Sequence, residues 1–243
     1  SSPHPWFSDA SEATELARSL NEDAAEVKAA HPGRYLFAAS LPLPDVGRSL
    51  EEIGYACDVL GADAVKLPSN AAGVYPGNLR LEPVLDELDR REAIVLLHPC
   101  APAAGMPECF SGRVLPVMEF LADTTRCVME LLVSGSFARH PHLRIVVPHC
   151  GSFLPTIARR IAGVSHVLAA TGRLDASVDV GAFRGLWYDL AGDVTPESLE
   201  ALRAVAADDH IVYGSDYPFT PTAAALEHQA SLEDLLGANL WQS

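Results

Sequence analysis

Basic residues are scarce in this sequence. It has 17 Lys and Arg against 32 Asp and Glu, which gives a formal net charge of −15. Nucleic-acid binding needs basic patches that neutralise phosphates, so we expect no nucleic-acid partner. The sequence also lacks a signal-peptide pattern and any apolar run near the roughly 20 residues that span a bilayer. We therefore expect no membrane partner, whereas a small anionic substrate stays compatible with a few local arginines.

Cysteine is also sparse, and it forms no metal or redox motif. The five cysteines, an odd number, are scattered without a Cys-x-x-Cys pair. This pattern predicts reduced, mostly buried thiols in a cytoplasmic protein. No Gly-x-Gly-x-x-Gly or Walker loop follows any expected strand, which weighs against a nucleotide-binding sheet.

Apolar residues are plentiful and form short runs between helical patterns. They make up 49% of the chain, enough for a substantial core. The expected strands are 35–41, 62–67, 93–97, 143–147, 186–190 and 211–213, and the expected helices are 9–30, 45–61, 83–91, 124–137, 152–168, 195–206 and 222–236. This alternation predicts a single α/β domain over residues 1–243, with a parallel sheet covered by helices. A doubly wound sheet and a barrel both fit it.

Three of the strand-like runs lead into an ionisable residue. His98, His149 and Asp216 each follow such a run. Because the carboxyl ends of parallel strands gather catalytic groups, we expect these side chains to form the functional site, and three separate strand ends favour a barrel. The structural alternatives are a His98 bonded to a backbone carbonyl, a His149 packed in the core, and an Asp216 that pairs with a cation or caps a helix.

Several short motifs cover nearly the whole chain and are specific when taken together. They are Leu20-Asn-Glu22, His31-Pro-Gly-Arg-Tyr35, Ser40-Leu-Pro-Leu-Pro-Asp45, Leu97-His-Pro99, Asp123-Thr-Thr-Arg126, Pro141-His-Leu-Arg144, Pro148-His-Cys-Gly-Ser-Phe-Leu-Pro155 and Tyr213-Gly-Ser-Asp-Tyr-Pro-Phe219. In this order they resemble the amidohydrolase-2 family, the group of aminocarboxymuconate-semialdehyde, γ-resorcylate and 6-methylsalicylate decarboxylases. The Asp-Thr-Thr-Arg run is most similar to the 6-methylsalicylate decarboxylase-like branch.

The resemblance implies a (β/α)8 TIM barrel of the metal-dependent-hydrolase type. It also implies one divalent metal ion, which we expect to be zinc, with manganese as the alternative. His98 and Asp216 match the family's strand-five and strand-eight metal ligands, and His149 and Asp216 match its catalytic residues. Arg160 matches an arginine that reaches the substrate carboxylate of a neighbouring subunit, which implies a homodimer.

One family feature is absent from the sequence. The family's first strand carries a His-x-His or Glu-x-His ligand pair, whereas His4 is followed by Pro5 and Trp6. By the resemblance, residues 1–3 correspond to the end of the second strand, so we expect a barrel that is incomplete at its N-terminus. Either the polypeptide is truncated or the preceding part was left out of the sequence.

The activity that the resemblance implies is non-oxidative decarboxylation of a small aromatic or enolic carboxylic acid. A divalent ion acts as a Lewis acid toward such a substrate, and His149 would carry the proton. A metal-dependent hydrolase of a lactone or amide fits the same scaffold, because fold alone does not choose between chemistries. An inactive barrel fragment or degenerate homologue is the third alternative.

Aromatic and basic residues supply the predicted substrate contacts. Arg160, Trp6 and Phe153 are the predicted substrate-binding residues, with Phe7 and Phe110 as further members of an aromatic pocket. Long Pro/Gly-rich loops in compact domains often act as lids, and we expect this of segment 99–116.

The remaining ionisable residues are expected to be structural. Asp189 is expected to support the site, and Arg126 to pair with Asp123 within one helical turn. Six further histidines are expected on the surface, namely His31, His140, His142, His166, His210 and His228.

Overall fold

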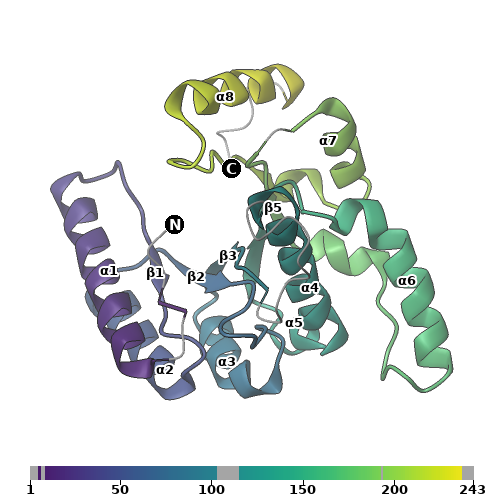
Figure 1. The fold of residues 1–243 in the computed structure, drawn as a ribbon, viewed down its shortest axis with the longest axis horizontal. Helices are drawn as coiled ribbons and strands as arrows, with labels where there is room; N and C mark the ends of the chain where they lie inside the picture. Colours follow the sequence, from purple (N-terminus) through teal and green to yellow (C-terminus); the bar gives the residue numbers. More distant parts are fainter. Residues whose placement is uncertain (1–4, 7–8, 103–114, 193, 237–243) are drawn as a thin grey trace. The chain divides into compact units, whose positions relative to one another are not determined.

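A computed structural model describes residues 5–6, 9–102, 115–192 and 194–236 of the chain (Figure 1). The chain divides into two compact units, Ser1–Ile145 and Val146–Ser243, and the boundary falls within strand β4 (Arg144–Val147). Among the helices of the described residues, none is both long and apolar enough to cross a membrane.

The first unit alternates strands and helices in the predicted order. Its elements are α1 (Ala10–Ala30), β1 (Ala38–Ser40), α2 (Val46–Gly54), the π-helix η1 (Tyr55–Val59), β2 (Ala64–Pro68), the 3-10 helix η2 (Leu79–Leu81), α3 (Glu82–Arg90), β3 (Ile94–His98), the π-helix η4 (Leu115–Glu119), α4 (Phe120–Val133) and α5 (Ser136–Arg139). β1 pairs with β2 and β2 pairs with β3, and both pairings are parallel. The prediction of a parallel sheet is confirmed in this unit.

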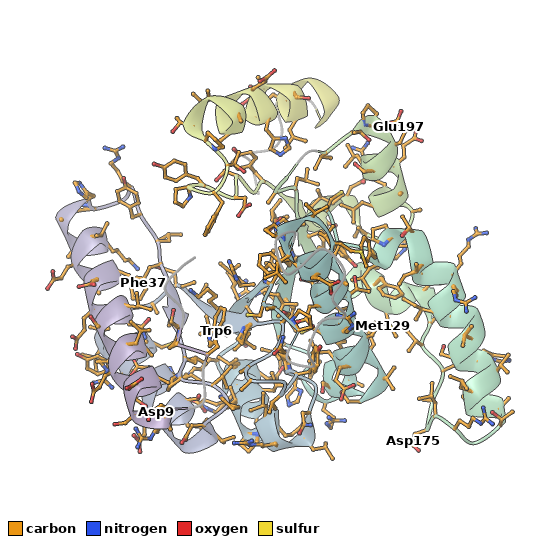
Figure 2. All side chains as sticks on the ribbon, in the orientation of Figure 1. Trp6, Asp9, Phe37, Met129, Asp175 and Glu197 are labelled. Atoms are coloured by element: carbon orange, nitrogen blue, oxygen red, sulfur yellow. The ribbon has the colours of Figure 1, made fainter. Side chains whose placement is uncertain are left out.

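Short acidic side chains start the first two helices. Figure 2 labels Asp9 at the beginning of α1. Its carboxylate accepts hydrogen bonds from the N–H groups of Ser11 at 3.0 Å and Glu12 at 2.9 Å. The Asp45 carboxylate, at the predicted beginning of the second helix, accepts from the Arg48 N–H at 3.0 Å. These bonds satisfy donors that the first turn of a helix leaves without an intrahelical partner. Local sequence therefore fixes where α1 and α2 begin.

Two predicted helices differ from the observed ones. The helix expected over 124–137 begins at Phe120 and is divided into α4 and α5, because Gly135 adopts a left-handed φ of 74°. The helix expected over 45–61 widens in its last turn into η1, where the Leu60 N–H donates to the carbonyl of Tyr55 at 3.1 Å. Neither change disturbs the order of the elements.

Strands β2 and β3 have one apolar, buried face and one face with ionisable side chains. The buried face carries Val65, Leu67, Val95 and Leu97. Side chains alternate between the two faces of a strand, so Lys66 and His98 lie on the opposite face together with Leu96. In the register of the two strands, Lys66 lies opposite Leu96, and Pro68 lies opposite His98.

The second unit continues the alternation. Its elements after β4 are α6 (Leu154–Ala170), the 3-10 helix η5 (Val180–Gly185), β5 (Trp187–Asp189), α7 (Pro196–Arg203), the 3-10 helix η6 (Asp208–His210), β6 (Ile211–Val212) and α8 (Thr222–Leu236). β4 pairs with β5 and β5 pairs with β6, again in parallel. The predicted parallel pairing is therefore confirmed in this unit as well.

The start of α7 and the core of the second unit follow from side-chain chemistry. The Ser198 N–H donates to Thr195 Oγ1 at 3.3 Å, and the Thr195 N–H donates to Ser198 Oγ at 2.9 Å. With Pro196 in the first position, this reciprocal pair is the predicted helix start. In the core, the buried Tyr188 hydroxyl donates to the carbonyl of Phe183 at 2.8 Å.

Gly77 lies so close to α4 that no side chain fits there. A Cβ at this position would lie 2.7 Å from the backbone carbon of Glu130 and from the backbone nitrogen of Leu131. We expect Gly77→Ala to lower the free energy of unfolding by about 1–3 kcal/mol, because the loop must move away from the helix. Urea denaturation measures this change.

Gly54→Ala is the matched control in the same unit. Gly54 has a helical φ of −56°, and a Cβ there meets no atom within 4 Å. This variant is expected to be neutral or more stable by about 0.5–1 kcal/mol, because alanine loses less backbone entropy on folding. Equal stability of the two variants would contradict the close approach of Gly77 to α4.

Candidate functional site

His98 is the last residue of β3, and its ring is held by the backbone of the next residue. Nδ1 lies 3.0 Å from the carbonyl oxygen of Pro99. A carbonyl only accepts hydrogen bonds, so Nδ1 carries a proton, and in the neutral ring the lone pair is therefore on Nε2. Histidines that bind a metal through one ring nitrogen commonly donate a hydrogen bond from the N–H of the other, as here. The hydrogen bond to a backbone carbonyl that we expected of a structural His98 is therefore present. The tautomer that it favours is also the one that binds a metal through Nε2.

Trp6 lies beside His98. The two ring centroids are 5.8 Å apart with a tilt of 45°, and Trp6 is only 6% exposed. Lys66 Nζ lies 5.1 Å from the centroid of the Trp6 ring. The structure thus brings one predicted substrate-binding residue together with one predicted metal ligand, and it adds a lysine that the sequence did not single out.

A buried carboxylate on α4, Asp123, holds the loop that follows β2. It accepts hydrogen bonds from Ser69 Oγ at 2.5 Å, Asn70 Nδ2 at 2.7 Å and the Tyr75 hydroxyl at 2.6 Å. Arg126 Nη1 lies 3.6 Å from the same carboxylate, which confirms the predicted pairing. Burial and the bond to Asp123 raise the pKa of Tyr75, so its hydroxyl stays a donor. We call Asp123 with these three donors the Asp123 network.

The Asp123 network also holds the backbone around His98. The Ser69 N–H donates to the carbonyl of His98 at 2.8 Å, and the Cys100 N–H donates to Ser69 Oγ at 2.8 Å. The Ser69 hydroxyl therefore accepts from the segment after β3 while it donates to Asp123. The sequence predicted only the Arg126 pair, because the partners of Asp123 lie more than 45 residues away along the chain.

In the second unit, His149 begins a left-handed turn. Its φ is 59°, and Cys150, Gly151 and Ser152 follow with φ values of 52°, 75° and 57°. For residues other than glycine this conformation is strained, and such strain concentrates at functional positions. The turn closes with a hydrogen bond of 2.8 Å from the Ser152 N–H to the His149 carbonyl.

Asp189, at the end of β5, supports this turn as the sequence predicted. Its Oδ1 accepts from the N–H groups of His149 at 2.9 Å and Ala191 at 3.0 Å. Its backbone carbonyl accepts from the Cys150 N–H at 2.8 Å. Burial raises the pKa of Asp189, and the nearby Asp216 carboxylate adds to this, although the two N–H bonds act in the opposite direction.

His149 and Asp216 present different kinds of polar atoms. Nδ1 of His149 is buried and has no hydrogen-bond partner among the described residues. Asp216 is exposed, follows β6 and also has a left-handed φ, of 52°. A Cβ on Gly214 would lie 3.0 Å from Cγ of Asp189, so glycine suits the point where the loop that carries Asp216 passes the Asp189 carboxylate. That His98 shares one site with His149 and Asp216 stays a prediction.

The two cysteines nearest these residues are not nucleophiles. Burial raises the pKa of Cys100 to about 12 and that of Cys150 to about 11. Their thiols are therefore protonated at neutral pH, and the thiolate is the reactive form. Cys57, Cys100, Cys127 and Cys150 are all free in the part of the chain that the structure describes.

The other predicted site residues lie on or before α6, or outside the described residues. Arg160 is exposed on α6, and Phe153 is half-buried immediately before it. Phe7, Phe110 and most of the predicted lid, 103–114, lie outside the described residues. Substrate binding by Arg160 and Phe153 stays a prediction.

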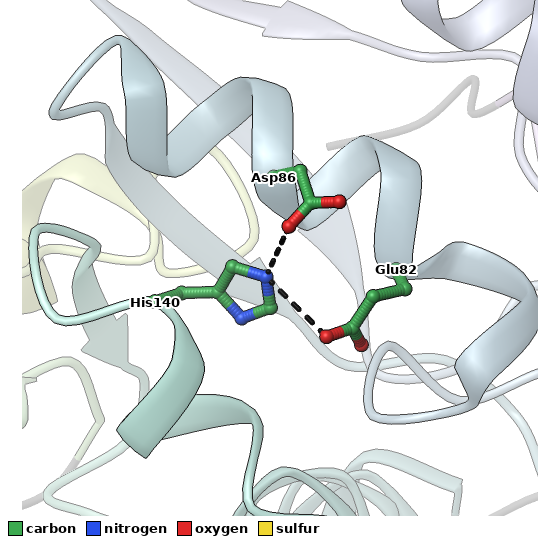
Figure 3. A group of neighbouring side chains, drawn as sticks. All are labelled: Glu82, Asp86 and His140. Carbon is green, nitrogen blue, oxygen red and sulfur yellow. Dashed lines mark hydrogen bonds and ion pairs between the residues drawn. The ribbon is translucent and has the colours of Figure 1, made fainter.

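The prediction that six histidines lie on the surface is wrong for His140. Its ring is buried, with Nδ1 at 2.8 Å from the Ser136 carbonyl and Nε2 at 3.1 Å from Asp86 and 3.6 Å from Glu82 (Figure 3). The acidic partners are on α3, far from His140 in sequence, which is why local pattern missed them. His210 and His228 are half-buried, whereas His31, His142 and His166 are exposed as predicted.

Glu82, Asp86 and His140 are the one group of three such side chains, among the described residues, whose ligand atoms lie within 4.8 Å of one another. None of them is a predicted metal ligand. The Arg139 guanidinium pairs with Glu82 and lowers the pKa of that carboxyl. Because the positive charge of Arg139 already balances the negative charge of Glu82, the cluster is best explained as ion pairs that hold α3 to the segment before β4.

The sequence is similar to proteins of known activity. The profile of the family described as Amidohydrolase matches residues 5–241. The chain is 35% identical over 234 residues to the 6-methylsalicylic acid decarboxylase of Penicillium expansum, covering 93% of this chain and 70% of that protein.

Solved structures share the fold. A protein solved as amidohydrolase II matches with a TM-score of 0.87 and 34% identity, over 97% of this chain and 76% of that one. The dihydroxybenzoic acid decarboxylase of Polaromonas sp. JS666, solved with manganese and the inhibitor 2-nitroresorcinol, matches with a TM-score of 0.84 and 23% identity, over 94% of this chain and 72% of that one.

The Asp123 network predicts a large difference between two substitutions. Asp123→Ala leaves three buried donors without an acceptor, and we expect the free energy of unfolding to fall by about 3 kcal/mol or more. Asp123→Asn can still accept from Ser69 and Asn70 and donate to the Tyr75 oxygen, so it should cost about half as much. Urea denaturation of both variants, with Tyr75→Phe as the single-donor control, checks this. An Asp123→Ala loss below about 1 kcal/mol would contradict the network.

Asp189 gives a prediction with a defined pH dependence. Asp189→Asn keeps the oxygen that accepts from His149 and Ala191 but removes the desolvated charge. Because the folded pKa is raised, the wild-type protein loses stability as pH rises from about 3.9, the ordinary Asp value, through the folded pKa. The stability of Asp189→Asn relative to wild type should therefore increase from pH 4 to pH 8. Unfolding in the presence of a chelator measures the difference.

The control for this prediction is Asp189→Ala. It removes the acceptor of two backbone N–H groups and should be less stable than Asp189→Asn by about 1–3 kcal/mol at either pH, because neither variant carries the charge. If the stability of Asp189→Asn relative to wild type falls from pH 4 to pH 8, the sign of the pKa shift is wrong.

Proposed function

Because the chain belongs to the amidohydrolase family, we propose that it is a carboxy-lyase that decarboxylates a small aromatic or enolic carboxylic acid. The observation that carries this proposal is the 35% identity to 6-methylsalicylic acid decarboxylase across 93% of the chain. In this reaction the bond between the substrate carbon and its carboxylate breaks, carbon dioxide leaves, and a proton takes its place on the carbon.

We propose His98 and Asp216 as ligands of a divalent metal ion. The chemistry of these donors supports this. The Nδ1–H of His98 donates to the Pro99 carbonyl, which favours the tautomer that binds a metal through Nε2, and Asp216 has an exposed carboxylate. When bound, the ion supplies Lewis-acid stabilisation of negative charge on the substrate oxygens. Imidazole and carboxylate ligands suit zinc and manganese, and zinc remains our first choice.

His149 is proposed as the residue that carries the proton. Its buried Nδ1 has no partner among the described residues, so this nitrogen is available to hold or deliver a proton. Asp189 fixes the backbone of the turn that carries the ring, which limits the directions in which the ring can point. Asp216 is proposed as a second proton-carrying group at the same site.

The finer features of the proposal concern binding and assembly. Trp6 and Phe153 provide aromatic surface for the ring of the substrate, and Arg160 binds its carboxylate from a neighbouring subunit of a homodimer. The free thiols of the described cysteines are compatible with the reducing cytoplasm that we propose as the location. Size-exclusion chromatography with light scattering tests the dimer.

Release of carbon dioxide is the direct test of the activity. We expect the protein, supplied with zinc or manganese, to release carbon dioxide from 6-methylsalicylate or a related hydroxybenzoate and not to open lactone rings. His149→Asn should lower the turnover number by about 10²–10⁴-fold while the bound metal stays constant, because proton transfer contributes that much.

His166→Asn is the control. His166 is exposed on α6, so this substitution should leave the turnover number unchanged. Metal content is measured on all three proteins by mass spectrometry. Lactone hydrolysis without carbon dioxide release would favour the hydrolase alternative, and absence of both activities with either metal would refute the proposed function.

A further inference from the structure

Lys66 lies on the ionisable face of β2, next to the strand that carries His98. Its register partner on β3 is Leu96, and two residues further along β3 lies His98. Because residues i and i+2 of a strand share a face, Lys66 and His98 are on the same face of this part of the sheet, separated by about 7 Å along the strand direction.

Trp6 is a neighbour of both residues. Lys66 Nζ is 5.1 Å from the centroid of the Trp6 ring, and the His98 ring is 5.8 Å from it. Trp6 itself is buried, so its ring is fixed in position. An ammonium group, a buried aromatic ring and a histidine therefore lie together within the first unit.

The environment of Lys66 is unusual for a lysine. The side chain is half-buried, and burial lowers its pKa. An ammonium group that has lost part of its hydration gains more from an opposite charge than a fully hydrated one does.

We propose that Lys66 is a substrate-binding residue whose ammonium group receives an anionic oxygen of the small carboxylic acid. The inference rests on the proposed function for the class of substrate. A lysine offers a compact positive charge with three donors, which suits a carboxylate or phenolate oxygen. Lys66 is therefore expected to select anionic over neutral ligands of the same shape.

Ligand binding tests the proposal without any need for turnover. We would titrate zinc-loaded protein with salicylate and with salicylamide, which has nearly the same shape but no charge. The wild-type protein should bind salicylate more tightly than salicylamide. Lys66→Met should weaken salicylate binding about tenfold or more and leave salicylamide binding unchanged, and Lys66→Arg should restore part of the difference.

Leu96→Met is the matched control, because it changes the register partner on the same face without changing charge. It should bind both ligands as the wild-type protein does. Thermal unfolding and metal content of Lys66→Met should match the wild type, which separates a binding effect from a folding or metal effect. Unchanged salicylate binding by Lys66→Met, or no salicylate binding by the wild type, would overturn the proposal.

The result is separable from that of the proposed function. If Lys66 governs salicylate binding but no carbon dioxide is released from any hydroxybenzoate, the binding role stands and the carboxy-lyase proposal fails. If Lys66→Met releases carbon dioxide with an unchanged KM, the carboxy-lyase proposal stands and Lys66 is not a binding residue. A raised KM with a nearly unchanged kcat supports both.

Discussion

The buried carboxylate of Asp123 is the constraint on which the first unit depends. A charge away from water is costly unless hydrogen bonds replace its hydration, and here three side-chain donors do so. The donors come from the loop after β2, so the cost of burying the charge is offset only when that loop is folded against α4. Ser69, which donates to this carboxylate, also bonds the His98 carbonyl through its N–H and the Cys100 N–H through its hydroxyl, and so fixes the backbone that follows the His98 Cα.

The second unit uses the same principle with a different residue. Asp189 accepts the His149 N–H with its carboxylate and the Cys150 N–H with its carbonyl, and thereby holds the first two of four consecutive residues with left-handed φ. Such a turn is strained, and fixed acceptors are what make it the stable conformation. In both units, then, a carboxylate fixes the backbone next to a predicted site residue: Asp123 on α4 for His98, and Asp189 at the end of β5 for His149. Neither Asp123 nor Asp189 has to contact substrate for its loss to impair the site.

The sequence predicted the element order, the parallel pairing and the helix starts at Asp45 and Thr195, because these depend on local pattern and capping chemistry. Membership of the amidohydrolase family and the TM-score of 0.87 confirm the predicted class, a (β/α)8 barrel, of which six strands lie in the described residues. What the sequence did not predict depends on partners far apart in the chain. His140 looked like a surface residue because its acidic partners on α3 lie more than 50 residues earlier.

The same reason explains why Lys66 was overlooked. A single lysine within an apolar run gives no local signal that distinguishes a solvated side chain from one turned toward a site. Only the register between β2 and β3, together with the position of Trp6, places its charge on the face that carries His98. A net charge of −15 makes such a cation more informative, since the chain as a whole repels anions and must attract an acidic substrate locally. An acidic protein that binds acids needs positive charge at the site, and Lys66 is such a charge on the His98 face.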